Sequence, residues 1–300
     1  MKNSLEGIYI PAVTPFDDRE RVSGEMLVYN IEKWNQTDVS GYMCLGSNGE
    51  FRMLDEEESL SVIKIFARHR AETKGLIAGV GRESLYHTLR FIDRIQSMDL
   101  KVDYLSVLTP HYFKKAMNDR ALIEYFTAVA DFSRIPILLY CAPGFANTVC
   151  ISCEALKVLA DHPNIHGIKD TSKNMMNAYM DAAGGRDDFE VMSGSMSTVF
   201  TCMDRGGKGG VVSASNYFPE QCAEVVRLYR EEGREKAWEY YTVLQGVIKK
   251  TGARGSVAGV KCCMNLMGLK GGLPRKPVLP ISAEIEAEMK QALLEAGFIS

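Results

Sequence analysis

The chain has 300 residues, of which 46% are hydrophobic and 24% charged, and its 35 basic and 38 acidic residues give a net charge of −3. This is the composition of an ordinary globular protein, and a chain of this length can bury a core without disulfides or a structural metal. The near balance of charges leaves no large basic face, which argues against nucleic acid as a partner.

The N-terminal segment lacks the basic region, apolar run and cleavage site of a signal peptide, because Pro11 and Pro15 interrupt its only apolar stretch. No eighteen apolar residues run together, so no membrane span is expected. The eight cysteines are scattered through apolar segments rather than spaced as a disulfide framework. We therefore expect a cytoplasmic protein.

Short apolar runs alternate along the chain with longer segments of helical periodicity. The runs predict eight strands, at residues 8–13, 42–45, 76–80, 102–108, 136–141, 165–169, 189–193 and 210–213. Helices are predicted between them, among others at residues 54–70, 85–98, 119–132, 153–160 and 173–183. Even alternation, with no dinucleotide-binding fingerprint after the first strand, favours a closed (β/α)8 TIM barrel over a doubly wound open sheet.

After residue 217 the strand pattern stops, and helices are predicted at residues 220–232, 234–251, 256–267 and 283–296. We expect residues 1–217 to form the barrel, which is the catalytic core. Residues 218–300 are expected to form a C-terminal helical extension of the same domain.

Catalytic groups of such barrels collect where strands end, and polar side chains stand at several predicted strand ends. Lys169 follows a buried run, where desolvation can free a neutral, nucleophilic amine that forms a Schiff base with a carbonyl. Pairing with Asp170 is the alternative interpretation of this lysine. Tyr140 ends the preceding strand and can relay a proton, or can be a packed aromatic residue.

Two further strand ends carry small polar groups. Ser47 and Asn48 lie on a Gly-Ser-Asn-Gly turn whose hydroxyl, amide and backbone N–H groups suit a carboxylate. Ser213, at the end of the eighth strand, is a further substrate-binding candidate. Phosphate binding around residues 193–195 and 213–216 stays open as an alternative.

Other motifs carry less weight. Cys150 and Cys153 have the C-x-x-C spacing, but no second pair or histidine follows at a zinc-like distance, and no metal site is predicted. The glycine-rich segment 206–210 does not match a phosphate-binding P-loop and is expected to be a tight turn before the eighth strand.

Taken together, the motifs of nearly the whole chain resemble the dihydrodipicolinate synthase/N-acetylneuraminate lyase family of Schiff-base-forming, pyruvate-handling barrel enzymes. The matching segments are Pro11-Ala12-Val13-Thr14-Pro15-Phe16, Gly46-Ser47-Asn48-Gly49-Glu50, Ala78-Gly79-Val80-Gly81, Thr109-Pro110-His111-Tyr112, Tyr140-Cys141-Ala142-Pro143, Gly167-Ile168-Lys169-Asp170 and Ser193-Gly194. Their order along the chain is also that of the family.

The resemblance implies that Lys169 forms the Schiff base with a 2-oxo acid, that Tyr140 relays the proton, and that Ser47 and Asn48 bind the carboxylate. Tyr112 matches a tyrosine that family members often donate across a dimer interface to complete the relay. The family also implies catalysis without a cofactor, pyruvate and an aldehyde as small-molecule partners, and a homotetramer built as a dimer of dimers.

The substrate is inferred from differences between branches of the family. The synthase branch resembles Tyr-Asn-x-Pro-x-Arg after strand five, whereas this chain has Cys141 after the tyrosine and no arginine there. Thr171 stands where aldolase branches place a hydroxyl residue to contact a substrate hydroxyl. The chain therefore looks most similar to 4-hydroxy-2-oxoglutarate aldolases.

Three alternatives stay open. The first is dihydrodipicolinate synthase, which would need another cation, such as Arg254 or Lys208, in place of the missing arginine. The second is an enzyme like N-acetylneuraminate lyase, although Gly194-Ser195-Met196-Ser197 lacks the acidic groups of that branch. The third is a barrel that binds a 2-oxo acid without turnover.

Overall fold

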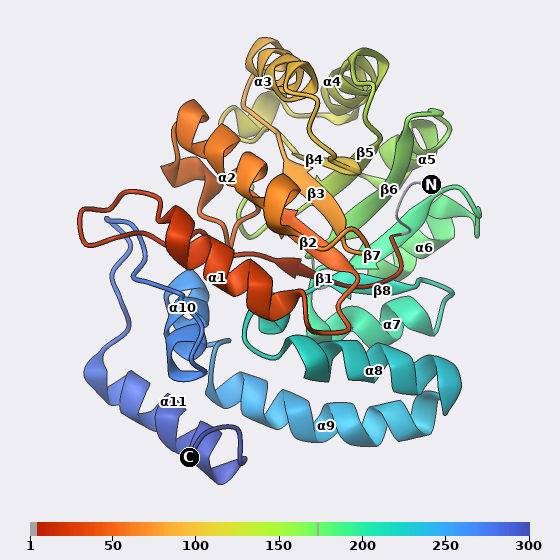
Figure 1. The fold of residues 1–300 in the computed structure, drawn as a ribbon. Coiled ribbons are helices and arrows are strands. Elements are labelled where there is room, and N and C mark those ends of the chain that lie inside the picture. The colour runs from red at the N-terminus through yellow and green to blue at the C-terminus, as the bar shows by residue number, and fades with distance from the viewer. Residues whose placement is uncertain (1–4, 173) are drawn as a thin grey trace. The chain divides into compact units, whose positions relative to one another are not determined.

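A computed structural model describes residues 5–172 and 174–300 of the chain. Its eight strands are parallel and follow one another as a closed barrel in chain order, which confirms the predicted fold class. Figure 1 shows the helices that connect them. The strands are β1 (Gly7–Pro11), β2 (Gly41–Cys44), β3 (Gly75–Gly79), β4 (Tyr104–Leu108), β5 (Ile137–Cys141), β6 (Ile165–Asp170), β7 (Glu190–Ser193) and β8 (Gly209–Val211).

Eleven helices are found in the described part of the chain: α1 (Gly24–Trp34), α2 (Glu56–His69), α3 (Leu85–Ser97), α4 (Asp119–Phe132), α5 (Cys153–Ala160), α6 (Met176–Ala183), α7 (Val199–Met203), α8 (Pro219–Glu231), α9 (Arg234–Lys250), α10 (Ser256–Leu266) and α11 (Ala283–Glu295). No described helix is long and apolar enough to cross a bilayer.

The predicted elements agree closely with those observed. All eight strands are confirmed with ends shifted by at most two residues, and the helices of residues 119–132 and 153–160 have the predicted bounds. The expected first residue of the sixth helix, Lys173, lies outside the described residues. Two helices, α1 and α7, were given no bounds from the sequence. A turn does precede β8, but it lies at residues 204–206, whereas the last two residues of the segment predicted as a turn, 206–210, belong to β8.

The helices begin and end where local signals place them. In α2, the Asp55 side chain accepts the N–H of Glu58 and the Glu58 side chain accepts the N–H of Asp55, which forms a capping box. In α4, Asn118 caps the N-terminus, and Leu122, Phe126 and Val129 bury one face at helical spacing.

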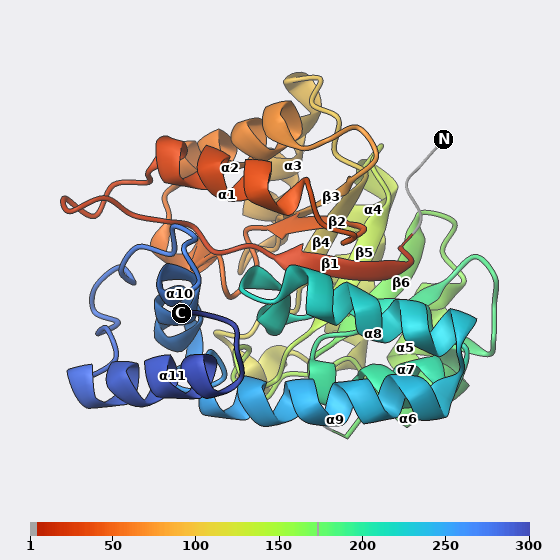
Figure 2. The same ribbon diagram turned by 60° about the horizontal axis from the view of Figure 1, so that its bottom comes forward.

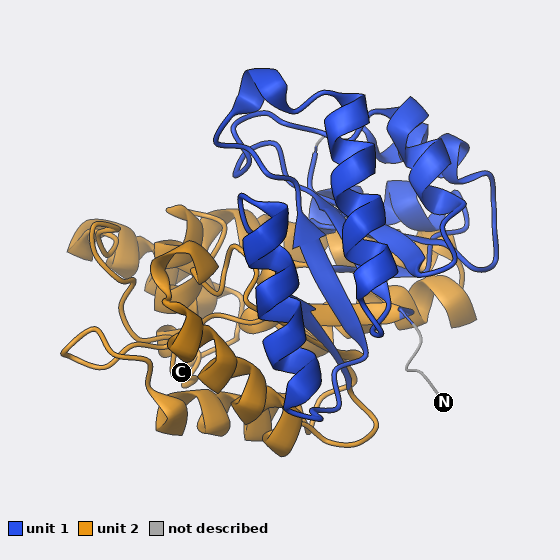
Figure 3. Ribbon diagram, turned by 90° about the horizontal axis from the view of Figure 1, so that it is seen from above, with its two compact units in different colours: residues 1–6, 75–211 blue, residues 7–74, 212–300 orange. Residues whose placement is uncertain are grey.

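The chain divides into two compact units, shown in different colours in Figure 3. The first comprises residues 1–6 and 75–211, and contains β3 to β8 with α3 to α7. Its strands pair in register from Ile77 beside Tyr104 to Ser193 beside Gly210. Because β5 and β6 are neighbours in this sheet, side chains near their carboxyl ends are brought together.

The second unit comprises residues 7–74 and 212–300, and contains β1, β2, α1, α2 and the helices from α8 onward. Figure 2 lets the reader follow α8 and α9 as two neighbouring helices of this unit. Its core includes Tyr42, whose ring lies 6.1 Å from that of Trp34 and 5.6 Å from that of Phe66. Burial of these aromatic rings stabilises the unit.

Candidate active site

Lys169 and Tyr140 form the centre of the candidate site in the first unit. They are register neighbours on β6 and β5, and each is only 3% exposed. The Lys169 Nζ atom lies 4.3 Å from the Tyr140 ring centroid. Burial lowers the pKa of Lys169, and the charge and hydrogen bonding of Tyr140 partly oppose this effect. An amine in this setting is neutral more often than a surface lysine, and so is a better nucleophile.

Asp170 does not form the ion pair with Lys169 that the sequence allowed. Its Oδ1 atom accepts the Ser172 N–H at 2.9 Å, whereas its buried Oδ2 atom has no hydrogen-bond partner among the described residues. Successive side chains of a strand point to opposite faces, which separates the two groups. Burial also raises the pKa of Asp170. Both Tyr140 and Lys169 lie one residue before their strands end: β5 ends at residue 141 as predicted, and β6 extends one residue beyond its predicted end.

Thr171 follows β6 and presents an uncommitted hydroxyl. Its N–H donates to the Cys141 carbonyl oxygen at 2.9 Å, which fixes the backbone. Its Oγ1 atom is buried and, like Oγ1 of Thr109 after β4, has no hydrogen-bond partner within residues 5–172 and 174–300. Buried hydroxyls without partners are rare in proteins and call for a functional or solvent explanation.

Tyr112 lies on the loop after β4, which Glu83 holds in place. One carboxylate oxygen of Glu83 accepts the N–H groups of both His111 and Tyr112 at 2.9 Å. The Tyr112 ring packs edge-on against Phe113, but its side chain is 75% exposed. Within its own chain, Tyr112 is therefore not packed against the buried lysine. Sequence reasoning missed Glu83, for which the only indication was an acidic residue shortly after β3.

The loop after β5 has no cation, as expected from the sequence. Asn147 donates from its side chain to the His111 carbonyl oxygen at 3.3 Å, and its φ of 48° is left-handed. The two cations considered as replacements are engaged elsewhere. Arg254 pairs with Glu288 at 2.5 Å, and Lys208 pairs with Glu6 at 3.3 Å.

Cys141, the residue after Tyr140, forms a thiol pair that was not predicted from the sequence. The Tyr179 hydroxyl contacts the Ile151 carbonyl oxygen at 2.5 Å and the Cys141 Sγ atom at 3.2 Å. Cys141 is also hydrogen-bonded to the half-buried Cys150 thiol, which lowers the pKa of Cys150 and raises that of Cys141. None of the eight cysteines forms a disulfide, and the described residues contain no cluster of His, Cys, Asp and Glu able to hold a metal.

The turn at residues 46–50 belongs to the second unit. Asn48 donates from its side chain to the Ser213 hydroxyl at 2.8 Å, so two of the predicted binding residues are in contact. Ser47, the third, is half-buried on the same turn. Leu45, just before the turn, and Glu50, its last residue, have left-handed φ values of 57° and 51°. Such strain in non-glycine residues persists only where surrounding contacts enforce it, and it is often found at functional sites.

The polar groups considered for phosphate binding are largely occupied within the fold. In the first unit, the Ser193 hydroxyl is within 2.7 Å of the Ser195 carbonyl oxygen and of the Thr198 hydroxyl. In the second, the Asn216 side chain accepts the Val13 N–H and donates to the Pro11 carbonyl oxygen. These contacts leave few donors for an anion.

Comparisons with known proteins show the family of the chain. The family model described as the dihydrodipicolinate synthetase family matches residues 4–296. The chain belongs to this family. As a member, it is an enzyme of the aldolase and lyase class.

Individual relatives carry two different names. A protein of Emericella nidulans named "Probable 4-hydroxy-2-oxoglutarate aldolase, mitochondrial" is 29% identical over 97% of this chain and 95% of its own. A 4-hydroxy-tetrahydrodipicolinate synthase of Caldicellulosiruptor saccharolyticus is also 29% identical, over 98% of this chain and 97% of its own. Identity alone therefore does not separate the two activities.

A solved structure of the family supports the fold. The dihydrodipicolinate synthase of Acinetobacter baumannii, described as chloride inhibited and complexed with pyruvate, is 26% identical. It matches 99% of this chain and 100% of its own with a TM-score of 0.88.

Proposed function

We propose that the chain is a Schiff-base-forming (class I) aldolase that cleaves or forms a hydroxy-2-oxo acid, with pyruvate as product or donor, and that 4-hydroxy-2-oxoglutarate is its substrate class. The observation that carries the proposal is the buried Lys169 amine, whose pKa is lowered beside Tyr140. The pyruvate complex of the Acinetobacter baumannii relative supports a 2-oxo acid as ligand.

Lys169 acts as the nucleophile. Its neutral amine adds to the keto carbon of the substrate, and loss of water from this adduct gives a protonated imine. The bond between C3 and C4 then breaks, and its electron pair moves toward the iminium to give an enamine of pyruvate. Protonation of the enamine and hydrolysis of the imine release pyruvate and restore the amine.

Tyr140 acts as the proton relay. Its phenol takes the proton of the C4 hydroxyl as the aldehyde leaves, and returns it when the reaction runs as a condensation. General acid–base catalysis of this kind contributes typically about 10² to 10⁴-fold. We assign the substrate hydroxyl itself to Thr171, whose buried Oγ1 atom has no partner among the described residues.

Ser47, Asn48 and Ser213 bind the carboxylate of the 2-oxo acid in this proposal. The contact between the Asn48 side chain and the Ser213 hydroxyl supports a common task for these residues. Tyr112 completes the proton relay from a second copy of the chain, and its exposed side chain is compatible with that role. Three further expectations remain predictions: that the protein is a homotetramer, that it is cytoplasmic, and that the barrel ends and the helical extension begins at residue 217.

The second candidate is 4-hydroxy-tetrahydrodipicolinate synthase, which the name of the Caldicellulosiruptor saccharolyticus relative favours. Against it, the loop after β5 lacks the arginine that binds the aldehyde carboxylate in that branch. Arg254 and Lys208 do not replace it, because each is already paired with a carboxylate. Losing a bidentate clamp is not a conservative change.

Borohydride reduction in the presence of pyruvate tests the proposal. We expect a pyruvyl adduct in the intact mass, mapped to Lys169 and absent from Lys169→Arg, whereas Lys114→Arg, at an exposed lysine, keeps the adduct. Pyruvate release from 4-hydroxy-2-oxoglutarate is then compared with condensation of pyruvate and aspartate semialdehyde. A faster second reaction would favour the synthase, and an adduct without any turnover would favour a binding protein.

A further inference from the structure

Lys261, on α10, is a second buried lysine with no part in the proposed chemistry. Its side chain is fully buried, and its ammonium lies 2.5 Å from Glu50 Oε1. It also donates to the Thr14 and Leu273 carbonyl oxygens at 2.8 and 2.9 Å. One ion pair and two hydrogen bonds thus surround the ammonium group with oxygen atoms, so the site suits a charged lysine.

Glu50 is the last residue of the turn that carries Ser47 and Asn48. Its second carboxylate oxygen accepts the backbone N–H of Arg275 at 2.9 Å, and its own N–H donates to the Ser47 carbonyl oxygen at 3.1 Å. Glu50 is 6% exposed and holds a left-handed φ of 51°. A carboxylate this deeply buried requires its cation, because an unpaired charge in the interior is costly.

Thr14 provides a second link between Lys261 and the same turn. The Thr14 carbonyl oxygen accepts from Lys261, while the Thr14 hydroxyl donates to the Gly49 carbonyl oxygen at 2.7 Å. One ammonium group thus fixes both residues that hold the turn, Glu50 at its end and Thr14 beside Gly49. The turn lies between these contacts and the bond from Asn48 to Ser213.

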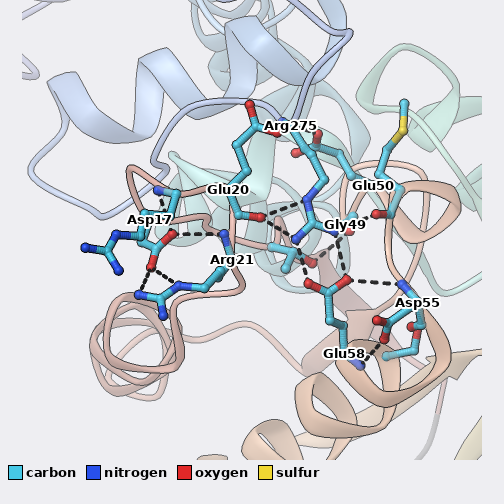
Figure 4. A network of polar contacts seen from close by, with 12 residues as sticks. Asp17, Glu20, Arg21, Gly49, Glu50, Asp55, Glu58 and Arg275 are labelled. Carbon is cyan, nitrogen blue, oxygen red and sulfur yellow. Dashed lines mark hydrogen bonds and ion pairs between the residues drawn. The ribbon is translucent and has the colours of Figure 1, made fainter.

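Arg275 belongs to the same network but holds a different part of it. Figure 4 shows its guanidinium between the Glu20 carbonyl oxygen and the Glu58 carboxylate. Its hydrogen bond to Glu50 is made by its backbone N–H, which every non-proline residue retains. The side chain of Arg275 therefore ties α2 to the loop at residues 17–21, whereas the side chain of Lys261 ties down the turn.

We propose that Lys261 is a positioning residue for the carboxylate of the 2-oxo acid: through Glu50 and Thr14 it holds the Ser47-Asn48 turn in its binding conformation without touching the substrate. This inference rests on the proposed function, because it assigns the carboxylate to that turn. It assigns roles to Lys261 and Glu50 that neither motif nor spacing had suggested.

The test measures how borohydride trapping depends on pyruvate concentration. In Lys261→Met we expect the half-saturating concentration to rise by about 10-fold or more, while the trapping rate at saturation changes by less than about 3-fold. Glu50→Gln/Lys261→Met removes both charges and is the variant of choice if the single substitution leaves an unfolded chain. We expect it to show the same loss of affinity, with a higher melting temperature than Lys261→Met.

Arg275→Met is the matched control. It removes a cation of the same network and lowers the melting temperature, but we expect the half-saturating concentration to stay within about 2-fold of wild type. If the network had a purely structural role, the half-saturating pyruvate concentration would change alike in Arg275→Met and Lys261→Met. That result would overturn the inference. So would an unchanged half-saturating concentration in folded Lys261→Met or in the double variant. Absence of an adduct in the wild-type protein would instead overturn the proposed function, and this inference with it.

Discussion

The Lys169 amine lies 4.3 Å from the centroid of the Tyr140 ring on the neighbouring strand. This relationship places the proposed nucleophile and the proposed proton relay side by side within one sheet. It also affects the pKa of Lys169, which burial lowers and Tyr140 raises.

Replacing Tyr140 should therefore have two separate effects, one on the pKa of Lys169 and one on turnover. In Tyr140→Phe the contributions that raise the pKa of Lys169 are gone, so the pH profile of adduct formation should shift to lower pH. In wild type the profile should already lie below that of a lysine with an ordinary pKa of about 10.4. Turnover should fall by roughly 10² or more.

Initial rates of borohydride trapping from pH 5 to 10, measured beside steady-state cleavage, check both parts. A pH profile that does not move, together with a fall of only a few-fold in turnover, would reduce Tyr140 to a packing residue.

The sequence was sufficient to predict the fold and this pair because both depend on local patterns. Apolar runs marked β5 and β6, and consecutive parallel strands are usually neighbours, so Tyr140 and Lys169 were expected near each other. Whether Lys169 paired with Asp170 could not be decided from the sequence. That outcome depends on which face of β6 each side chain takes and on the N–H of Ser172.

The supporting contacts could not be predicted in the same way. Lys261 and Thr14 are 247 positions apart, and no pattern within either segment indicates the other. Glu83 holds the loop of Tyr112 by accepting backbone N–H groups. Because every non-proline residue has such a group, the sequence of that loop does not indicate the contact. The exposure of Tyr112 likewise depends on tertiary packing.

Thr171→Val should separate substrate recognition from stability. The Thr171 hydroxyl has no hydrogen-bond partner among the described residues, so a methyl group in its place breaks no hydrogen bond between them. We expect an unchanged or slightly raised melting temperature. For cleavage of a hydroxy-2-oxo acid, kcat/KM should fall by roughly 10-fold, which corresponds to the free energy of one lost hydrogen bond.

Pyruvate has no C4 hydroxyl, so its trapping by Thr171→Val should match wild type, and Thr171→Ser should recover cleavage. Equal losses in trapping and cleavage would contradict the assignment of Thr171 to the substrate hydroxyl.

Gly194→Ala should disturb the end of β6, because Gly194 directly follows the neighbouring strand β7. A Cβ atom there would lie 2.7 Å from the Asp170 carbonyl oxygen and 2.8 Å from Thr171 Oγ1. Overpacking of this kind typically costs about 1–3 kcal/mol of unfolding free energy. Because the displaced groups adjoin Lys169, activity should fall as well.

Urea denaturation and cleavage assays measure the two effects. Gly144→Ala is the control, because an added Cβ would meet nothing within 4 Å there and should change stability by less than about 0.5 kcal/mol. Similar stabilities of the two variants would show that the approach of Gly194 to β6 does not constrain the site.

Cys150 should be the most reactive of the thiols near the site. The Cys141 thiol hydrogen-bonds to it and lowers its pKa, whereas burial raises the pKa of Cys153. Because the thiolate is the reactive form, iodoacetamide at pH 7 should modify Cys150 faster than Cys153, as measured by peptide mass spectrometry. Cys141→Ala removes the hydrogen bond and should slow the reaction at Cys150, and Cys153→Ser should leave it unchanged. Equal rates at Cys150 and Cys153 in wild type would contradict the thiol pair, and with it the direct contact between the loop after β5 and the residue that follows Tyr140.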